Sequence, residues 1–363
     1  MNIQSLPKRQ TRPPVIVAIP ARNEADRIGA CLDALDNQTT KPDAVIVLFN
    51  NSTDDGEMIV RGMRPRFDLH VVAVDLPPET AGAGPARRLA MEHAAQLAGP
   101  GGILMTSDAD GMVAPDWVQL NLAGLLAGAD AVCGRAIIDP AEATLIPRHL
   151  HDDDALEQRL AALLDEMASL IDPDMADPLP RHTEASGASL AVWVSAWRRA
   201  GGIPPIMTAE DRGFIAALRW LDARIRHDPA ITVVVSGRTE GRAVGGMAEA
   251  IRRRIVRQDE FTDDALEPAA DALRRLTLLA RSRAVWATHR PDPTLADDFG
   301  VPSEDLQKAL SRPFFGAAWA ELQGKGVLSQ RRRVRFADLP REIAAAEALL
   351  TQLAVRPDNL VAA

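Results

Sequence analysis

The chain has 363 residues, of which 47% are hydrophobic and 25% are charged. These proportions are ordinary for a soluble globular protein, and the length allows one large domain or two. The formal net charge of −9 argues against nucleic acid as the main partner, because phosphate backbones are bound by basic surfaces.

Two cysteines, Cys31 and Cys133, are too few for a disulfide framework or a cysteine metal cluster. Both lie in apolar contexts, so we expect buried thiols in a reducing compartment. The first 14 residues are polar and contain prolines, without the apolar core of a signal peptide. The most apolar stretch, 188–197, is too short to span a bilayer. We therefore expect a cytoplasmic protein with no integral membrane segment.

Short aliphatic or β-branched runs bounded by turn residues predict strands at 15–19, 44–49, 71–74, 103–105 and 231–235. Between them, apolar residues recur at helical spacing over 28–35 and 86–97, which predicts amphipathic helices. This alternation is typical of an α/β fold with a mostly parallel sheet covered by helices on both faces. Ligands of such sheets bind at the carboxyl ends of the strands.

The remainder of the chain is predicted to be mainly helical. Residues 139–186 are rich in Asp, Pro and charged helix formers, and we interpret them as a helical insertion. Beyond Gly246, long Ala/Leu/Arg stretches such as 264–284 and 342–353 predict helices almost to the end. We place a domain boundary near 245, between an α/β domain (1–245) and a helical C-terminal extension (246–363).

Asp108 and Asp110 follow the strand predicted at 103–105. In an extended segment, residues i and i+2 point to the same side, so both carboxylates can face one cation. Mg²⁺ or Mn²⁺ prefers oxygen ligands and can neutralise the charge that develops on a departing diphosphate. Asp-x-Asp-Gly is also common in solvated turns, and that alternative stays open.

Polar residues also follow the first two predicted strands and begin the second helix. Asn23 and Glu24 are suited to capping a helix, but they also lie in a loop that would face a ligand. Asn50 begins a similar loop. Arg87 lies near a predicted helix start, where a cation opposes the helix dipole. An anionic ligand would explain it, as would an ordinary surface position.

Three further segments carry candidate residues. Glu210 and Asp211 precede an apolar helix, and we interpret Asp211 as a general base or as N-terminal helix charge. Arg238 and Arg242 lie in a loop that would close over a diphosphate or form a solvated basic turn. His227 is a candidate third metal ligand, although a lone histidine is more often structural.

Taken in order, these segments resemble family-2 glycosyltransferases of the GT-A fold, the inverting class that uses nucleotide-diphospho-sugars. The matching segments lie at predicted strand ends or helix starts: 15–24, 50–54, 84–88, 107–110, 115–117, 187–189 and 210–211. The resemblance implies donor-side contacts from Pro20, Arg22, Glu24, Asn50, Arg87 and Ser107, metal ligation by Asp108 and Asp110, and an acidic pair, Glu210 and Asp211, with Asp211 as the base.

The chain departs from the family pattern at identifiable positions. Phe49 stands where the family often has an acidic residue that contacts the nucleobase, which leaves the base open. Arg88 replaces a more usual Asn. The Gln-x-x-Arg-Trp motif and membrane helices of processive members do not occur in the sequence, which favours a soluble enzyme that makes single transfers.

The leading prediction is an Mg²⁺- or Mn²⁺-dependent, inverting transfer of a sugar from a nucleotide-diphospho-sugar to a hydroxyl of a small molecule or glycan. One alternative is a retaining synthase of related fold acting on a small acceptor such as glycerate. A sugar nucleotidyltransferase is disfavoured because 20–24 contains no glycine. A non-catalytic nucleotide-sugar-binding protein is the third alternative. The sequence is also compatible with a homodimer.

Overall fold

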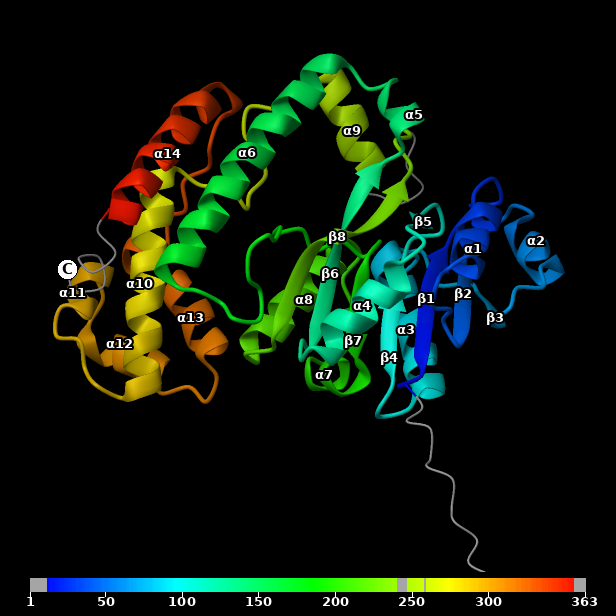
Figure 1. Cartoon of the computed structure of the whole chain (residues 1–363), viewed down its shortest axis with the longest axis horizontal. Helices are drawn as coiled ribbons and strands as arrows, with labels where there is room; N and C mark the ends of the chain where they lie inside the picture. The colour runs from blue at the N-terminus through cyan, green and yellow to red at the C-terminus, as the bar shows by residue number, and fades with distance from the viewer. Residues whose placement is uncertain (1–11, 240–246, 258, 356–363) are drawn as a thin grey trace, which may run out of the picture.

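The structure is a computed structural model that describes residues 12–239, 247–257 and 259–355. Within these ranges the strands form one sheet in the order β3-β2-β1-β4-β7-β6-β8-β5. Their bounds are β1 (Val15–Ala21), β2 (Ala44–Asn50), β3 (Asp68–Val74), β4 (Ile103–Thr106), β5 (Met112–Val113), β6 (Ala131–Ile138), β7 (Leu190–Trp193) and β8 (Ile225–Val235). Figure 1 shows the sheet at one end of the molecule and a group of helices at the other.

The sheet is mostly parallel, as predicted. β1 pairs in parallel with β2 and β4, and β2 pairs in parallel with β3. β7 is antiparallel to both β4 and β6, so β6 runs in the same direction as β4, and β8 is parallel to β6. The short β5 pairs antiparallel with β8 at the edge. The carboxyl ends of β1, β2, β4, β6 and β8 therefore meet at one edge, together with the beginning of β7.

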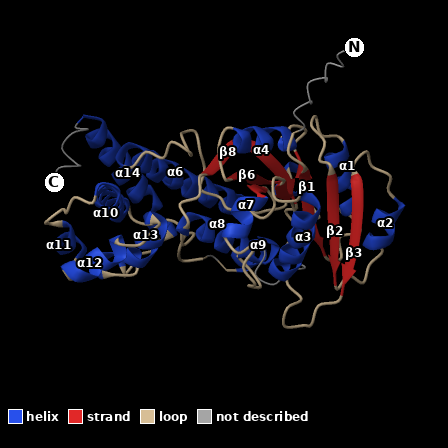
Figure 2. Ribbon diagram, turned by 90° about the horizontal axis from the view of Figure 1, so that it is seen from below, coloured by secondary structure: helices blue, strands red, loops and turns tan. Residues whose placement is uncertain are grey.

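Helices cover both faces of the sheet, which confirms the predicted α/β class (Figure 2). One face packs against α1 (Ile28–Asp36) and α4 (Trp117–Leu126), and the other against α3 (Ala83–Ala98), α7 (Val194–Arg199) and α8 (Glu210–Trp220). α2 (Gly56–Gly62) contacts α1 and β3. β1 and β2 are almost fully buried, because their apolar side chains project from both faces of the sheet and both faces are covered by helices. Cys31 and Cys133 are buried, as expected.

All five predicted strands are present, although β3 and β8 begin earlier than expected. The sequence did not predict β5, β6 or β7. β5 has two residues and β7 has four, which is too short for an alternating pattern to be distinctive. β7 lies in the apolar stretch at 188–197, where the chain passes from strand directly into α7.

The helices predicted after the sheet are also present within the described residues. They are α5 (Pro140–Ala143), α6 (Arg148–Ile171), α9 (Met247–Val256), α10 (Ala269–Thr288), α11 (Leu295–Phe299), α12 (Ser303–Leu310), α13 (Phe315–Gln323), α14 (Leu339–Val355) and the short 3₁₀ helices Gly326–Leu328 and Phe336–Asp338. None of the helices described is long and apolar enough to cross a bilayer.

The long helix α6 packs with the C-terminal helices, not with the sheet. Leu160 and Met167 of α6 share one apolar cluster with Leu276 of α10 and Leu350 of α14. Figure 1 shows α6 running from the end of the sheet to α14 and α10. We call α6 together with α9–α14 the helical unit. The domain boundary near 245 lies outside the described residues, and the division into two domains remains a proposal.

The helical unit meets the α/β part at the end of α8. Asp222 follows this helix with a positive φ of 53°. Its carboxylate accepts hydrogen bonds from the backbone N–H groups of Phe315 (2.7 Å) and Gly316 (2.6 Å). These are the first two residues of α13, where helix N–H groups lack partners within the helix. Asp222 therefore caps α13 and attaches the helical unit beside α8.

Candidate active site

Asp108 and Asp110 lie just beyond the carboxyl end of β4. They do not continue the strand, because Gly111 N–H donates to the Asp108 carbonyl (3.0 Å) and closes a turn. The Asp108 side chain is 38% exposed, whereas that of Asp110 is only 15% exposed. Burial and the nearby Asp108 carboxylate raise the pKa of Asp110 to about 6. The two carboxylates are thus electrostatically coupled, although a turn and not an extended segment brings them together.

Glu24 and Arg238 link the ends of β1 and β8. Arg238 donates from Nη1 and Nη2 to the two carboxylate oxygens of Glu24, at 2.9 and 2.6 Å. Its Nη2 also lies 3.3 Å from Asp110 Oδ2. Glu24 is buried, whereas the Arg238 side chain is 23% exposed. Arg238 thus connects the nucleotide-loop candidate Glu24 with the metal-ligand candidate Asp110. Arg242 lies outside the described residues.

Glu142 of α5 fixes the beginning of the Arg238 loop, which the sequence did not predict. Its carboxylate accepts from Ser236 Oγ (3.0 Å) and Gly237 N–H (2.6 Å), and it also pairs with Arg27. These hydrogen bonds hold the pKa of Glu142 below its usual value, the Arg27 contact having the largest effect. The insertion predicted at 139–186 therefore contributes a residue that supports the candidate site.

Arg87 is buried between the Asp108 turn and the beginning of α8. Its guanidinium donates to Asp108 Oδ1 (2.6 Å), Glu210 Oε1 (2.9 Å), Thr106 Oγ1 (2.8 Å) and the Gly187 carbonyl (2.9 Å). The residue is 5% exposed. The predicted anion beside this arginine is therefore supplied by the protein's own carboxylates.

Asp211 and Glu210 occupy different environments although they are adjacent. Glu210 is buried against Arg87, so the structure gives it a structural ion pair. Asp211 is partly exposed, and its Oδ2 accepts a hydrogen bond from Gly187 N–H (2.8 Å). Gly187 begins the approach to β7 at the same sheet edge as Asp108. The arrangement leaves Asp211, and not Glu210, available to a substrate.

Close packing explains two glycines of this region. A Cβ on Gly84 would overlap the carbonyl oxygen of Ile206, in the segment that leads to α8. A Cβ on Gly187 would lie 2.5 Å from Cζ of Arg87. Both glycines therefore allow the beginning of α3, with its arginine, to approach α8 and β7 closely.

The loops after β1 and β2 are joined to each other. Asn23, with a φ of 54°, accepts the Thr53 N–H on Oδ1 (2.7 Å), and Asp54 Oδ2 accepts the Ala25 N–H (2.7 Å). Arg22 donates to the Ala81 carbonyl (2.9 Å). Pro20 lies within β1. The predicted nucleotide loops are thus hydrogen-bonded to each other, and some of their polar side chains bind the opposite loop and not a ligand.

Two buried polar atoms at this edge have no protein partner among the described residues. They are Asn50 Oδ1, at the end of β2, and Ser107 Oγ, directly after β4. Asn50 is 2% exposed, and its Nδ2 donates to the Gly82 carbonyl (3.4 Å). Buried polar atoms are normally hydrogen-bonded, so these two are positions at which a bound ligand would supply a partner.

The structure does not bring His227 to the aspartate pair. His227 lies near the beginning of β8, and β6 and β7 separate that strand from β4. Its Nδ1 lies 2.7 Å from Asp177 Oδ2, and its Nε2 lies 3.4 Å from Arg219. The described residues contain no group of three His, Cys, Asp or Glu arranged to hold a metal. The buried partner Asp177, which the sequence did not reveal, gives His227 a structural role.

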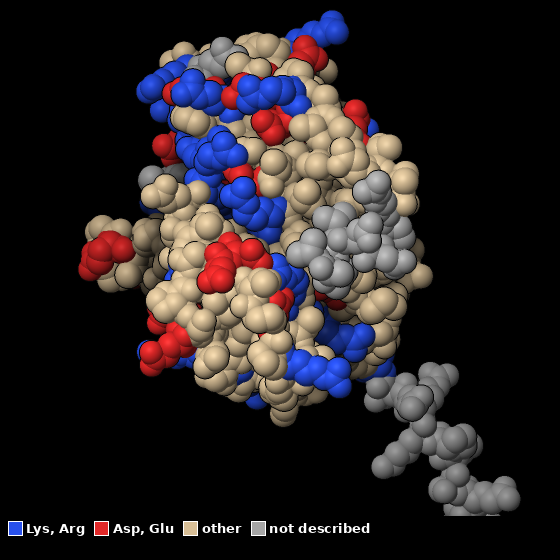
Figure 3. Space-filling model, turned by 90° about the vertical axis from the view of Figure 1, so that its left-hand side faces the viewer, with Lys and Arg blue, Asp and Glu red and all other residues tan. Residues whose placement is uncertain are grey.

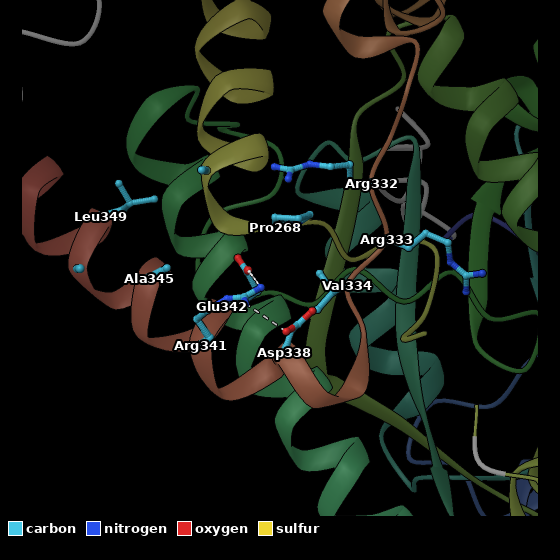
Figure 4. Close-up of a pocket in the computed structure, with 11 residues that line it drawn as sticks. Pro268, Arg332, Arg333, Val334, Asp338, Arg341, Glu342, Ala345 and Leu349 are labelled. Carbon is cyan, nitrogen blue, oxygen red and sulfur yellow. Dashed lines mark hydrogen bonds and ion pairs between the residues drawn. The ribbon is translucent and has the colours of Figure 1, made fainter. Parts of the chain in front are cut away.

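The helical unit has a separate hollow of about 540 Å³, lined by residues of α10, α14 and the segment between Arg332 and Val334. Figure 4 shows Arg341 paired with Asp338 (3.3 Å) and Glu342 (3.2 Å), whereas Arg333 points away from the hollow. Lys and Arg gather in a band on the face drawn in Figure 3, with Asp and Glu among them. The cations that line the hollow are paired, and Figure 1 shows α10 and α14 far from β4. The hollow is therefore not part of the candidate site.

Comparison with known sequences finds that the α/β part of the chain is similar to a family of glycosyltransferases. Residues 16–175 match the family model described as "Glycosyl transferase family 2". This match confirms the resemblance found in the sequence. Among curated proteins, none matches the chain.

Several solved structures are similar to the chain. Residues 1–349 of S. aureus TarS, in complex with UDP, share 16% identity at a TM-score of 0.45, over 93% of this chain and 91% of that one. The mannosyltransferase PcManGT from Pyrobaculum calidifontis, with GDP-Man and Mn²⁺, shares 20% identity at 0.46, over 98% and 87%. Glucosyl-3-phosphoglycerate synthase from Mycobacterium tuberculosis, with Mn²⁺, UDP and phosphoglyceric acid, shares 19% at 0.39, over 68% and 81%. These low values assign no donor, cation or acceptor to this chain.

Proposed function

We propose that the protein transfers a sugar from a nucleotide-diphospho-sugar to a hydroxyl acceptor, with inversion, in a reaction that depends on a divalent cation. The observation that carries this proposal is the placement of Asp108, Asp110 and Asp211 at one sheet edge. The aspartate pair lies after β4, and Asp211 is hydrogen-bonded to the segment that leads into β7. Donor and acceptor chemistry would therefore meet at this edge.

The residues present fit a hard divalent cation. Two coupled carboxylates offer oxygen ligands. Burial and the Asp108 carboxylate raise the pKa of Asp110, and a cation bound between the two would favour its charged form. With only two protein carboxylates in the pair, Mg²⁺ or Mn²⁺ would be completed by diphosphate oxygens and water, which is typical of these ions at phosphate sites. When bound, the cation would neutralise the negative charge that develops on the departing diphosphate.

The chain's own residues would carry out the remaining steps. Asp211 would accept the proton of the acceptor hydroxyl, whose oxygen then attacks the anomeric carbon from the face opposite the diphosphate. The bond between that carbon and the diphosphate oxygen breaks, and its electron pair leaves with the nucleoside diphosphate. Arg238 would contribute positive charge beside the diphosphate.

The nucleotide would lie against the loops after β1 and β2. Phe49 belongs to the apolar core and has no side-chain group that could hydrogen-bond a nucleobase. Asn50 Oδ1 and Ser107 Oγ are buried acceptors without a protein partner among the described residues, and an N–H or O–H of the nucleoside would satisfy them. Asn50 accordingly replaces the acidic residue as the candidate base contact.

The first test is binding of candidate donors. We expect one of UDP-, GDP- or TDP-sugars to raise the melting temperature with Mn²⁺ and to lose this effect with EDTA, because a ligand of the native state stabilises it. Metal-dependent hydrolysis of the same donor then shows catalysis. Silence across the panel would favour a non-catalytic protein.

Asp211→Asn tests the base. The variant keeps the side-chain size and one of the two oxygens that accept the backbone N–H groups of Gly187 and Arg212. Donor affinity should therefore stay within about threefold of the wild-type value. Transfer should fall by roughly 10²–10⁴-fold, the usual contribution of a general base. Normal turnover would refute the assignment. The anomeric configuration of the product, measured by NMR, decides between inversion and the retaining alternative.

A further inference from the structure

Arg87 contacts both the donor side and the acceptor side of the candidate site. We propose that it is a positioning residue that sets the Asp108 carboxylate and the base Asp211 relative to each other, and that it is not a ligand of the donor diphosphate. This inference rests on the proposed function, because it assigns Arg87 a role within that reaction.

The hydrogen bonds of Arg87 leave it little capacity for a substrate. A guanidinium has five N–H donors. Nε donates to Glu210, one Nη group donates to Thr106 and Gly187, and the other donates to Asp108. The side chain is 6% exposed. A diphosphate would therefore have to displace internal partners from a nearly closed environment.

On the donor side, Arg87 determines how Asp108 is presented. The short contact from Nη2 occupies Oδ1 of Asp108, at 2.6 Å. Since a charge-assisted hydrogen bond of this length is strong, Oδ2 is the oxygen that Asp108 can offer to a cation. The 38% exposure of the Asp108 side chain is consistent with one oxygen bound inside the protein and one at the surface.

On the acceptor side, Arg87 is connected to Asp211 through its hydrogen bonds to two residues, Gly187 and Glu210. It holds the carbonyl of Gly187 at 2.9 Å, and the N–H of the same residue donates to Asp211 Oδ2 at 2.8 Å. It also binds Glu210, the residue directly before Asp211, at 2.9 Å. A shift of the guanidinium would move both the Gly187 peptide and the first turn of α8.

These two sets of contacts set the distance between the Asp108 carboxylate and Asp211. The anomeric carbon would be held through the diphosphate on the Asp108 side, and the attacking hydroxyl would be oriented by Asp211. A misplacement of about 1 Å between reacting groups costs on the order of 10²-fold in rate. Loss of Arg87 should therefore lower the rate of reaction much more than it weakens donor binding.

Arg87→Lys tests this inference, since it keeps the charge but cannot reach all four partners. The dissociation constants of UDP and GDP with Mn²⁺ are measured by calorimetry, and kcat is measured as Mn²⁺-dependent hydrolysis of the sugar nucleotide that the wild type uses. We expect kcat to fall about 10²-fold, with the dissociation constant changed by less than about threefold. Arg88→Lys is the matched control, because Arg88 instead donates to the Ile203 carbonyl and pairs with Glu92.

Arg87→Ala adds a readout that a purely structural role would not produce. Free guanidinium ion should enter the vacated space and restore part of kcat, whereas the same concentration of sodium chloride should not. If Arg87→Lys and Arg87→Ala fail to fold, Glu210→Gln keeps the arginine and removes the charge of one of its partners. This variant should also lower kcat with little change in the dissociation constant, but to a smaller extent.

The possible results separate a failure of the role assigned to Arg87 from a failure of the proposed function. A tenfold or greater rise in the dissociation constant with unchanged kcat would make Arg87 a diphosphate ligand and overturn the inference. Unchanged kcat in Arg87→Lys, or no guanidinium rescue in a folded Arg87→Ala, would also overturn it. A wild-type protein that binds neither UDP nor GDP with Mn²⁺, and hydrolyses no sugar nucleotide, would instead overturn the proposed function.

Discussion

Arg87 at the sheet edge and Arg281 in the helical unit are both buried arginines that bind two carboxylates, yet they connect very different parts of the chain. Arg281, 9% exposed, donates to Asp292 (2.8 Å) and Asp298 (2.6 Å), which lie 11 and 17 residues away. The carboxylates of Arg87 come from Asp108 and Glu210, 21 and 123 residues away. One arginine closes a local loop, whereas the other joins separate elements.

The surroundings of the two arginines differ in the same way. Near Arg87, Ser107 Oγ and Asn50 Oδ1 lack protein partners among the described residues, and the pKa of Asp110 is raised. Around Arg281, Thr294 provides a further acceptor at 2.7 Å, and the adjacent core is apolar. Burying ions costs desolvation energy that apolar packing avoids. The helical unit also contains buried hydroxyl groups without a partner among the described residues, those of Ser169 and Ser282. The contrast therefore rests on the coupled carboxylates of Asp108 and Asp110, which mark the sheet edge as the candidate ligand site.

Within the comparison of these two regions, the largest expected effect is that of Asp110→Asn on activity. The variant removes one of the two proposed carboxylate ligands of the cation without changing the side-chain size, so kcat should fall by roughly 10²–10³-fold, as when one preorganised electrostatic group is lost. Asp298→Asn removes one carboxylate from Arg281 and is the control, with unchanged kcat. Steady-state hydrolysis of the donor with Mn²⁺ measures both. Equal losses in the two variants would show that the sheet edge is not special.

The strand ends could be predicted because each rests on a local pattern. β1, β2 and β4 are continuous apolar runs, and parallel pairing places their polar successors Glu24, Asn50 and Asp108 at one edge. The helix-dipole argument also offered an anion beside Arg87 as one of two alternatives, the other being a surface position. It could not show that this anion belongs to the protein, because Glu210 lies 123 residues further along the chain.

The remaining features depend on contacts that no local pattern encodes. Glu142 reaches Arg27 across 115 residues, from a segment that the sequence describes only as an insertion. His227 was predicted as a ligand because its partner Asp177, 50 residues away, could not be recognised. The association of α6 with α10 and α14 is likewise a tertiary choice, since an amphipathic helix does not specify which apolar surface covers it.

The pH dependence of cation binding gives the next largest effect. With its pKa raised to about 6, Asp110 holds a proton below that pH, and the proton competes with a cation for the carboxylate. Affinity for Mn²⁺ should therefore rise by up to about tenfold per pH unit as pH increases toward 6, and then level off. Titration of Mn²⁺ by electron paramagnetic resonance from pH 5 to pH 8 measures this.

Asp110→Asn provides the control for the pH experiment. It should bind Mn²⁺ more weakly and without the inflection near 6, because the amide does not titrate in this range. An inflection that persists in the variant would assign the titration to another group and would remove this part of the electrostatic contrast.

Arg281→Met should produce the smallest effect, and on stability alone. The change removes hydrogen bonds to Asp292, Asp298 and Thr294, but two of these acceptors can turn to water, since the side chains of Asp292 and Asp298 are 25% and 46% exposed. We expect the free energy of unfolding to fall by about 1–2 kcal/mol, measured by urea denaturation. Donor affinity and kcat should be unchanged, because the contacts of Arg281 stay within a loop of the helical unit. A loss of kcat in the folded variant would show that this loop is coupled to the sheet edge, and the local and long-range arginines would then serve the same site.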